Sequence, residues 1–597
     1  MGRLSANVLR YGKEGPLPQR RELRAGPLSL VYEEGGIRYV RLGGREVVRR
    51  VYVAVRDPAW GTVPHRIGDL RIAQEPDSFC IGFTCENVEG AIAFAWRGTV
   101  SGEPDGTVTF AMDGWARSAF RTSRTGLCVL HPIAECAGRP CSVEHTDGTV
   151  EDGRFPLLIS PHQPFMDLRA ISHEVAPGVR TEVRFEGDTF EMEDQRNWTD
   201  ASYKTYSRPL ALTRPYELHA GERVRQTVRI RLSGSPPLPV GESEAPAVSV
   251  CVGAPGPLPR IGFCGGTGRQ RARAAALRPG HLRVQLRLGE PDWQVALMEA
   301  AEGACPLEVA LIPGDGAEDE LRALRAALDG TRPNVVAWFV LAGGPPTLAA
   351  VRRIVDDYGR PALVGGGSAG GFVELNRSRP ERSALDAVTY AMNPQVHQFD
   401  NASMVEALDG QAWTIRTARE FLGDVPLAVG PITLGRAPDE RQASLFCAAW
   451  TVGSLRRVCE GSAWSATYYE TAGPGGLMAS GDGPVFPVYH VFADVAEFAG
   501  GESLALGVSH PLLADGLALR KGARTCALLA NMTNELQAVT LSGVRGRALV
   551  RTMDETNAER AMFEPQGFRA ERGRPLVGDL VELPPYAVAR VDWGEDA

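Results

Sequence analysis

The chain has 597 residues, of which 44% are hydrophobic and 23% charged, and its formal net charge is −8 at pH 7. This length exceeds what one hydrophobic core supports and predicts roughly two to four domains. The acidic balance argues against a nucleic-acid-binding protein, and the lack of about 18 consecutive apolar residues argues against a membrane-spanning helix.

Cysteine usage and the N-terminal residues indicate the compartment. The eleven cysteines are an odd number, and most stand among apolar residues, as Cys264 and Cys447 do. Scattered cysteines in a large chain are typical of reduced thiols rather than of a disulfide framework. Residues 1–23 contain no apolar stretch of the kind that a signal peptide needs. We therefore expect a cytoplasmic protein.

Residues 20–235 predict β-strands. Apolar and polar positions alternate in this region, with Gly, Asp or Asn at the turns, and long helical periods are scarce. The pattern predicts an N-terminal β-sandwich domain over residues 1–240. The stretch 233–247, SGSPPLPVGESEAPA, is rich in Pro, Gly and Ser and indicates a linker.

Between residues 246 and 500 the period changes, and short apolar runs alternate with amphipathic helical segments. This rhythm predicts a (β/α)8 TIM barrel as the catalytic domain. An open doubly wound sheet is the alternative, but no Gly-x-Gly-x-x-Gly motif opens a helix here. The eight predicted strands are Arg260–Cys264, Leu282–Leu288, Glu308–Ile312, Val335–Leu341, Ala362–Val364, Ala387–Met392, Leu427–Val429 and Ala466–Tyr469.

Strand patterns return in residues 501–597 and predict a C-terminal β-sandwich domain. The whole chain is thus predicted to be multidomain, with an α/β barrel between two all-β parts. The order β-sandwich, barrel, β-sandwich is common among enzymes that act on carbohydrates. That comparison is an analogy at the level of the fold and assigns no function.

The stretch VGGGSAGG, residues 364–371, has the Gly-x-Ser-x-Gly spacing of a serine-hydrolase nucleophile elbow, centred on Ser368. Such an elbow needs a strand, a sharp turn at the serine and a helix directly after it. After Ser368 come two more glycines and then Asn376 to Pro380, which predict a poor helix start. We therefore favour glycines that leave room at a barrel mouth over a nucleophilic Ser368.

Carboxylates follow two of the predicted barrel strands. Glu470 comes directly after the β-prone run SATYY, and Glu374 lies in the loop after the fifth strand. At such positions a side chain faces the active site of a barrel, so each carboxylate is a candidate base, nucleophile or hydrogen-bond anchor. A salt-bridged loop glutamate is the alternative for each.

The separation of this pair is similar to that of the acid/base and nucleophile glutamates in the large clan of retaining glycosidases built on this barrel. Two departures stand against the comparison. The clan places Asn directly before its acid/base Glu, whereas here Asn376 follows Glu374. In addition, each of the two glutamates follows a barrel strand one later in the strand count than its counterpart in the clan.

Other polar residues near strand ends are binding candidates. His397 is either a proton carrier or the partner of a backbone carbonyl, and Asn393 fixes a loop or a substrate hydroxyl. No metal site is expected, because the Cys and His residues between 128 and 145 fit no zinc-ligand spacing. Acidic residues also follow the second and third predicted strands, at Glu290, Asp292 and Asp315.

A second polar cluster lies in the N-terminal domain, in residues 190–206, FEMEDQRNWTDASYKTY. Aromatic side chains interleaved with charged ones are typical of surfaces that bind sugars. Lys204 is one of only three lysines in an arginine-rich chain, and such a lysine can mark a role that arginine does not fill. We expect Arg196 and Lys204 to contribute to substrate binding at the barrel mouth. A solvated edge, or a seal between domains, is the alternative.

Four segments, in this order over nearly the whole chain, resemble the D-apionate lactonase family: FEMEDQRNWTDASYKTY, YAMNPQVHQFDN, SATYYETAGPGGL and ELPPYAVARVDW. The resemblance implies an N-terminal β-domain, a central TIM barrel and a C-terminal β-domain. It also implies hydrolysis of D-apionolactone to D-apionate, a step in the use of the branched plant pentose apiose. The resemblance assigns no catalytic residues, so the candidates still rest on their positions at strand ends.

These expectations together describe a sugar-acid lactonase that needs no cofactor. The catalytic candidates are Glu374 and Glu470, with the choice between base and nucleophile open. A glycoside hydrolase with the same two glutamates, or a non-catalytic carbohydrate-binding protein, is the alternative. The expected partner is a small sugar lactone rather than a nucleic acid or a membrane. Whether the chain forms a homo-oligomer is left open. The substrate-binding candidates are Asn376, Asn393, His397, Tyr468, Arg196 and Lys204.

Overall fold

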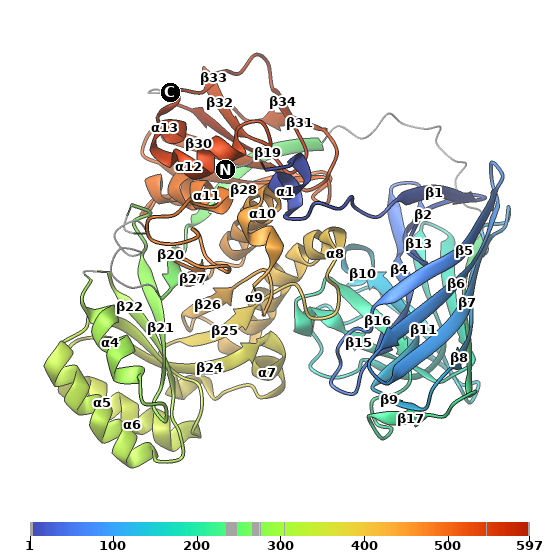
Figure 1. The fold of residues 1–597 in the computed structure, drawn as a ribbon, viewed down its shortest axis with the longest axis horizontal. Coiled ribbons are helices and arrows are strands. Elements are labelled where there is room, and N and C mark those ends of the chain that lie inside the picture. The colour runs from blue at the N-terminus through green and yellow to red at the C-terminus, as the bar shows by residue number, and fades with distance from the viewer. Residues whose placement is uncertain are drawn as a thin grey trace. The chain divides into compact units, whose positions relative to one another are not determined.

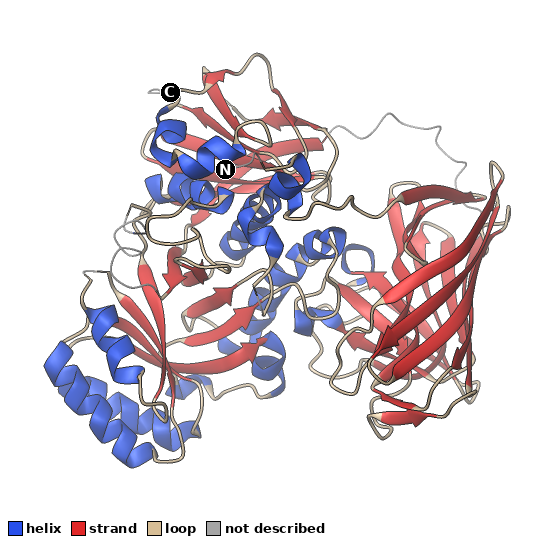
Figure 2. Ribbon diagram, in the orientation of Figure 1, coloured by secondary structure: helices blue, strands red, loops and turns tan. Residues whose placement is uncertain are grey.

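The computed structural model describes residues 4–234, 248–265, 274, 276–303, 305–436, 438–544 and 546–594. The chain divides into two compact units. The N-terminal unit contains residues 17–196 and 201–244, and the barrel unit contains residues 1–16, 197–200 and 245–597. Strands dominate the first unit, whereas the second combines helices and strands (Figure 1, Figure 2). The predicted linker lies outside the described residues from position 235 onward.

The N-terminal unit is built from antiparallel strands, as the alternating pattern predicts. In β6 (Phe79–Glu89) alternate side chains are buried, and β6 pairs with β7 (Ile92–Gly102) along its whole length. One extended sheet runs in the order β1-β2-β3-β4-β10-β16-β15-β13-β14-β18-β8-β7-β6-β5, and β11 and β12 join it beside β13. The all-β fold expected for this part is confirmed.

The other elements of the N-terminal unit complete this sheet and its connections. Its remaining strands are β1 (Arg20–Ala25), β2 (Leu28–Glu33), β3 (Gly36–Leu42), β4 (Arg45–Arg56), β5 (His65–Gln74), β8 (Val108–Ala116), β10 (Arg124–Pro132), β11 (Pro140–His145), β12 (Val150–Arg154), β13 (Phe165–Ala176), β14 (Val179–Glu186), β15 (Phe190–Asp194), β16 (Ser202–Ser207) and β18 (Arg223–Gly234). A separate pair is formed by β9 (Phe120–Thr122) and β17 (Tyr216–Leu218), and the short helical segments are α2 (Ile133–Cys136) and η1 (Gln195–Trp198).

The barrel unit contains a closed parallel barrel. Its strands pair in chain order from β20 to β27, and β27 pairs with β20 to close the ring. Each of the eight predicted runs overlaps one of these strands, which confirms the TIM barrel over the open sheet. The strands are β20 (Arg260–Cys264), β21 (His281–Arg287), β22 (Leu307–Ile312), β23 (Val335–Val340), β24 (Leu363–Gly371), β25 (Val388–Met392), β26 (Leu427–Ile432) and β27 (Ser465–Glu470).

Helices follow most of the barrel strands, and local sequence explains where they begin and end. The first turn of α5 is acidic, which favours the positive end of the helix dipole. Gly330 lies inside the last turn of α5, and Arg332 closes the helix with φ at +48°. The helical segments are α4 (Trp293–Ala301), α5 (Ala317–Thr331), α6 (Gly344–Tyr358), α7 (Phe372–Arg377), η2 (Arg382–Ala384), α8 (Asn401–Glu406), α9 (Leu408–Leu422), η3 (Glu440–Ala443), α10 (Leu445–Glu460) and α11 (Pro487–Glu497).

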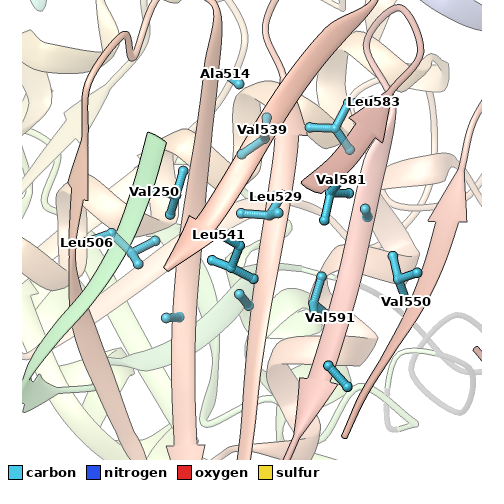
Figure 3. Close-up of a cluster of buried hydrophobic side chains, with 14 of the residues drawn as sticks. Val250, Leu506, Ala514, Leu529, Val539, Leu541, Val550, Val581, Leu583 and Val591 are labelled. Carbon is cyan, nitrogen blue, oxygen red and sulfur yellow. The ribbon is translucent and has the colours of Figure 1, made fainter. Parts of the chain in front are cut away.

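The C-terminal strands form a second sheet of the barrel unit, around the apolar core drawn in Figure 3. Its order is β33-β32-β35-β30-β29-β28-β19-β31-β34. Its strands are β19 (Val248–Pro257), β28 (Glu502–Val508), β29 (Ala514–Lys521), β30 (Arg524–Asn531), β31 (Gln537–Ser542), β32 (Ala548–Met553), β33 (Arg574–Pro575), β34 (Leu580–Leu583) and β35 (Val588–Trp593), with helices α12 (Ala558–Phe563) and α13 (Pro565–Ala570).

One segment joins a different part of the fold from the one expected. The barrel domain was predicted to begin at residue 246, but β19 pairs antiparallel with β28 and parallel with β31. Val248 and Val250 are fully buried in the C-terminal core. The barrel itself begins only at β20, because β19 gains its burial from strands far along the chain.

Charged contacts hold the C-terminal sheet to the barrel. Asp515, at the start of β29, is fully buried and accepts hydrogen bonds from Arg456 and Arg457 on α10. The short helix α1 (Ala6–Tyr11) also packs in this unit, where the Tyr11 ring meets Tyr586 edge-on.

Across the described ranges, no helix has the length and apolar character needed to cross a membrane.

Candidate active site

The carboxyl ends of β20, β26 and β27, with the middle of β21, surround a cavity of about 410 Å³. Active sites of TIM barrels are built at this end of the strands. The cavity is lined by Cys264, Gly265, Arg283, Val284, Gln285, Pro431, Glu470, Thr471 and Ala472.

Glu470 is the last residue of β27, where the sequence placed it. Its backbone N–H donates to the carbonyl oxygen of Gly475 (3.2 Å), and its own carbonyl accepts from the N–H of Leu477 (3.0 Å). These bonds fix the backbone at the point where strand becomes loop. The side chain of Glu470 is exposed and lines the cavity, and its carboxylate has no hydrogen bond or ion pair with another described residue. A carboxylate held this way is suited to act on a bound molecule.

Arg283 is a cavity residue that the sequence analysis missed. It lies within β21 and its side chain is 5% exposed. Its Nη1 donates to the hydroxyl of Thr389 on β25 (2.9 Å), and the guanidinium lies 5.4 Å from the ring centre of Phe339 on β23. Contacts with strands across the barrel show that this side chain points into the barrel interior. The cavity therefore carries a fixed cation as well as the carboxylate of Glu470.

Cys264 also lines the cavity, on the strand beside Glu470. It is aligned with Glu470 in the pairing of β20 and β27. Burial raises the pKa of the Cys264 thiol to about 12. The thiol is therefore protonated at neutral pH and is not a nucleophile.

The glycine-rich stretch of β24 places Ser368 against Glu374. The hydroxyl of Ser368 donates to the Glu374 carboxylate in a short hydrogen bond and accepts from the N–H of Gly370 (3.0 Å). A Cβ at Gly370 would collide with the carboxylate of Glu374. A Cβ at Gly365 would collide with the carbonyl oxygen of Ala387, and a Cβ at Gly367 would collide with that of Thr389 on β25. The glycines thus allow close backbone packing and let Glu374 reach Ser368.

A helix does follow this stretch, contrary to the expectation that none would. The strand β24 continues through Gly371, and α7 begins at Phe372. Phe372 is fully buried and packs edge-on against Tyr390, which stabilises the helix despite its poor intrinsic propensity. Ser368 lies inside the strand rather than at the turn before α7, so the geometry is not that of a nucleophile elbow.

Asn376 and His397 contact the segment 197–200, which belongs to the barrel unit. The side-chain amide of Asn376 donates to the side-chain oxygen of Asn197 (3.0 Å). His397 Nδ1 lies 2.9 Å from the Asp200 carboxylate, and its ring meets Trp198 edge-on at 5.9 Å. The structure therefore brings part of the polar cluster predicted in residues 190–206 to two candidates near the ends of β24 and β25.

Asn393 and Tyr468 take different positions. The side chain of Asn393 accepts from the N–H of Gln395 (3.2 Å) in the turn after β25. Tyr468 is fully buried, and its hydroxyl lies 2.9 Å from that of Ser454 on α10. Burial raises the pKa of Tyr468 above its ordinary value. The Tyr468 side chain thus faces the helix layer rather than the cavity, while Asn393 shapes a loop at the barrel end.

Arg196 and Lys204 belong to the N-terminal unit. The Arg196 guanidinium is fully buried and forms a two-pronged ion pair with Asp194, with N···O distances of 2.9 and 2.7 Å. It also donates to the carbonyl oxygens of Pro156 and Leu157. Lys204 is 1% exposed in β16, opposite Glu193 in the pairing with β15. Both side chains are buried, and Arg196 is held by residues of its own unit.

The candidates thus fall into groups. Glu470 shares the cavity with Arg283, whereas Glu374, on α7 after the fifth barrel strand, accepts a hydrogen bond from Ser368 inside that strand. The acidic residues Glu290, Asp292 and Asp315 are exposed in the loops after β21 and β22. Within the part of the chain that the structure describes, no three His, Cys, Asp or Glu residues are grouped as metal ligands.

One sequence signal could have revealed Arg283. In β21, which reads HLRVQLR, polar residues alternate with Leu, Val and Leu. The interior of a barrel is usually filled by branched apolar side chains. A barrel strand that presents His281, Arg283 and Gln285 on one face therefore indicates a polar, functional interior.

A closed parallel barrel whose carboxyl end holds a carboxylate and a guanidinium in one cavity defines the class of TIM-barrel enzymes. The sequence matches the three domains of D-apionate lactonase: the N-terminal domain at residues 8–235, the TIM barrel domain at 265–500 and the C-terminal immunoglobulin-like domain at 511–591. A D-apionate lactonase from Brucella anthropi is 35% identical over 460 residues, which span 71% of this chain and 74% of that protein. The chain belongs to the D-apionate lactonase family and is therefore a hydrolase of a cyclic carboxylic ester.

Two solved structures align with this chain at low identity. A GH30 endoxylanase from Clostridium papyrosolvens aligns with 58% of this chain and 100% of its own, at 12% identity and a TM-score of 0.42. A beta-arabinopyranosidase aligns with 96% of this chain and 100% of its own, at 11% identity and a TM-score of 0.34. At these values the likenesses carry no functional information.

Proposed function

We propose that this protein hydrolyses D-apionolactone to D-apionate, and that the reaction takes place in the cavity at the carboxyl end of the barrel. Family membership supports the choice of lactone, since the relative from Brucella anthropi is named a D-apionate lactonase. The position of Glu470 is the observation that carries the choice of site, because its exposed carboxylate ends β27 and lines the cavity.

In this proposal Glu470 acts as a general base. Its carboxylate takes a proton from a water molecule, whose oxygen forms a bond to the carbonyl carbon of the lactone. The carbonyl electron pair moves onto the carbonyl oxygen, and hydrogen-bond donors stabilise that oxyanion. When the intermediate collapses, the bond to the ring oxygen breaks, and Glu470 returns the proton to that oxygen. The product is an open-chain hydroxy acid, which loses a proton at neutral pH.

Direct attack by Glu470 on the carbonyl carbon is the second route, with an acyl-enzyme that water then hydrolyses. A single turnover in ¹⁸O-labelled water tests for the second route. The base route places one ¹⁸O in the carboxylate of the first product molecule and none in Glu470. In the nucleophile route the acyl-enzyme is an anhydride, and water that attacks Cδ of Glu470 leaves ¹⁸O in Glu470 and gives the first product an oxygen from the enzyme, so ¹⁸O in Glu470 identifies this route.

Glu374 is proposed as the acid/base partner of Glu470, with Asn376, Asn393 and His397 as donors around the substrate. Support for this group is its position near the ends of β24 and β25, where Asn376 and His397 are oriented by Asn197 and Asp200. Tyr468 is assigned to the support of β27 rather than to the substrate, because its hydroxyl faces Ser454 on α10. For Arg196 and Lys204, the expected role in substrate binding stays a prediction.

The experiment is a pH-stat measurement of acid release by the purified protein. D-apionolactone is offered beside other five-membered sugar lactones and beside aryl glycosides. We expect rapid acid release from D-apionolactone and no aryl alcohol from the glycosides. Release of aryl alcohol alone would favour a glycosidase, and inactivity on all substrates would favour a carbohydrate-binding protein.

A further inference from the structure

The guanidinium of Arg283 is held from several strands of the barrel yet keeps donors for a ligand. Thr389 accepts from Nη1, and Phe339 lies beside the guanidinium. Within the described ranges, Thr389 is the one hydrogen-bond acceptor that contacts this group, although arginine has five N–H donors. Since Arg283 also lines the cavity, the remaining donors are available to a molecule bound there.

A buried carboxylate lies behind this cation. Glu308 on β22 is fully buried, and its Oε2 lies 3.9 Å from Arg283 Nη1 and 3.4 Å from His281 Nε2. Among the described residues no donor makes a hydrogen bond to either carboxylate oxygen. Burial lowers the pKa of His281 to about 4, so this ring is neutral at neutral pH and Arg283 is the cation that faces Glu308.

A buried charge pair of this kind is poorly explained by stability. Taking both charges out of water costs free energy that a loose contact does not offset, and apolar side chains usually fill a barrel interior. Arg283, the cation of this pair, lines the same cavity as Glu470. A buried guanidinium beside this cavity is better explained by a bound ligand whose oxygen atoms interact with the positive charge.

We propose that Arg283 binds the acyl oxygens of the substrate, first the lactone carbonyl and then the carboxylate of the product, and that Glu308 positions Arg283 for this task. The inference rests on the proposed lactone hydrolysis and deepens it. When water adds to the carbonyl carbon, the electron pair of the C=O bond moves to the oxygen that Arg283 faces. After the ring C–O bond breaks, the same guanidinium can hold both carboxylate oxygens, which its planar fork fits.

The test compares Arg283→Lys, Arg283→Ala and Glu308→Gln with wild type, with Arg322→Lys as the matched control. Arg322 lies on the outer helix α5, is exposed and pairs with Asp319. The lysine variant keeps a cation beside Glu308 and is expected to fold. Hydrolysis of D-apionolactone is measured by pH-stat, and D-apionate binding is measured by calorimetry.

We expect Arg283→Lys to lower kcat/KM by about 10²-fold or more, the size seen when one oxyanion donor is removed. D-apionate binding should weaken in the same variant, and guanidinium chloride, but not sodium chloride, should restore part of the activity of Arg283→Ala. Turnover and D-apionate affinity of Arg283→Lys within threefold of wild type would overturn the role of Arg283. Wild type that fails to open the lactone would instead count against the proposed function.

The role of Glu308 has its own readout. If Glu308 acts through Arg283, Glu308→Gln should weaken D-apionate binding in wild type and have little further effect in the Arg283→Lys background. A merely structural Glu308 would weaken both backgrounds by the same factor, and that additive result would overturn its positioning role. Melting temperatures of all variants establish that the comparison is made on folded protein.

Discussion

Replacement of Glu470 by glutamine tests the central catalytic residue. The change keeps the size of the side chain and removes its negative charge. Because the Glu470 carboxylate has no hydrogen bond or ion pair with another described residue, the fold loses no contact of that side chain. The effect should therefore fall on catalysis rather than on stability.

The size of the effect follows from the role of the group. A positioned general base contributes about 10²- to 10⁴-fold to a rate, and 10²-fold corresponds to about 2.7 kcal/mol of activation free energy. We expect Glu470→Gln to lower kcat on D-apionolactone by about 10²-fold or more, with KM changed far less. The melting temperature should stay near that of wild type.

The assay is initial-rate acid release by pH-stat, with circular dichroism to check folding. Glu318→Gln serves as the control, because Glu318 is an exposed glutamate on the outer helix α5. The control should retain wild-type kcat. A folded Glu470→Gln variant whose kcat lies within threefold of wild type would refute the reasoning that places Glu470 at the reacting atoms.

Three further predictions concern the serine, the buried ion pair and the histidines. Ser368→Ala should keep substantial turnover, and serine-directed phosphonates should leave the enzyme active; stoichiometric labelling of Ser368 with loss of activity would restore the elbow hypothesis. Arg196→Met should lower the free energy of unfolding by about 3 kcal/mol or more, because Asp194 stays buried without this cation; a loss below about 1 kcal/mol in urea unfolding would contradict the buried-pair assignment. Burial lowers the pKa of His281 and His490 to about 4 in the folded protein. Above about pH 6.5 the two rings are neutral in the folded and in the unfolded protein, whereas between about pH 6.5 and 4 they bind protons in the unfolded protein only. The melting temperature should therefore fall as the pH decreases through this window, and a calorimetric midpoint that stays constant would argue against neutral buried rings.

The barrel could be predicted because its signals are local. Apolar runs such as Arg260–Cys264 and amphipathic helices such as α6 carry their own periodicity, and the runs alternate in a barrel rhythm. The assignment of β19 could not be predicted in this way. Val250 pairs with Val508, and periodicity within a segment does not reveal a partner so distant in sequence.

The candidate site was predicted in part. Glu470 was found because it directly follows a strand, and a strand end in a barrel is a position with chemical meaning. Arg283 was missed because it lies within a strand, where apolar packing was the expectation. Tyr468 was expected at the barrel mouth, but β27 is irregular near Tyr469, whose φ is +24°, and both tyrosines bond to α10. The alternation of side chains is lost at such an irregularity, and residue identities alone do not reveal it.

The position of the substrate tests the central claim most directly. The measurement is a crystal structure of the Glu470→Gln variant with D-apionolactone bound. We expect the lactone in the cavity at the carboxyl ends of β20, β26 and β27, with its carbonyl oxygen in hydrogen-bond reach of Arg283 and its carbonyl carbon facing residue 470. A lactone bound elsewhere, with this cavity holding only water, would contradict the assignment of the active site.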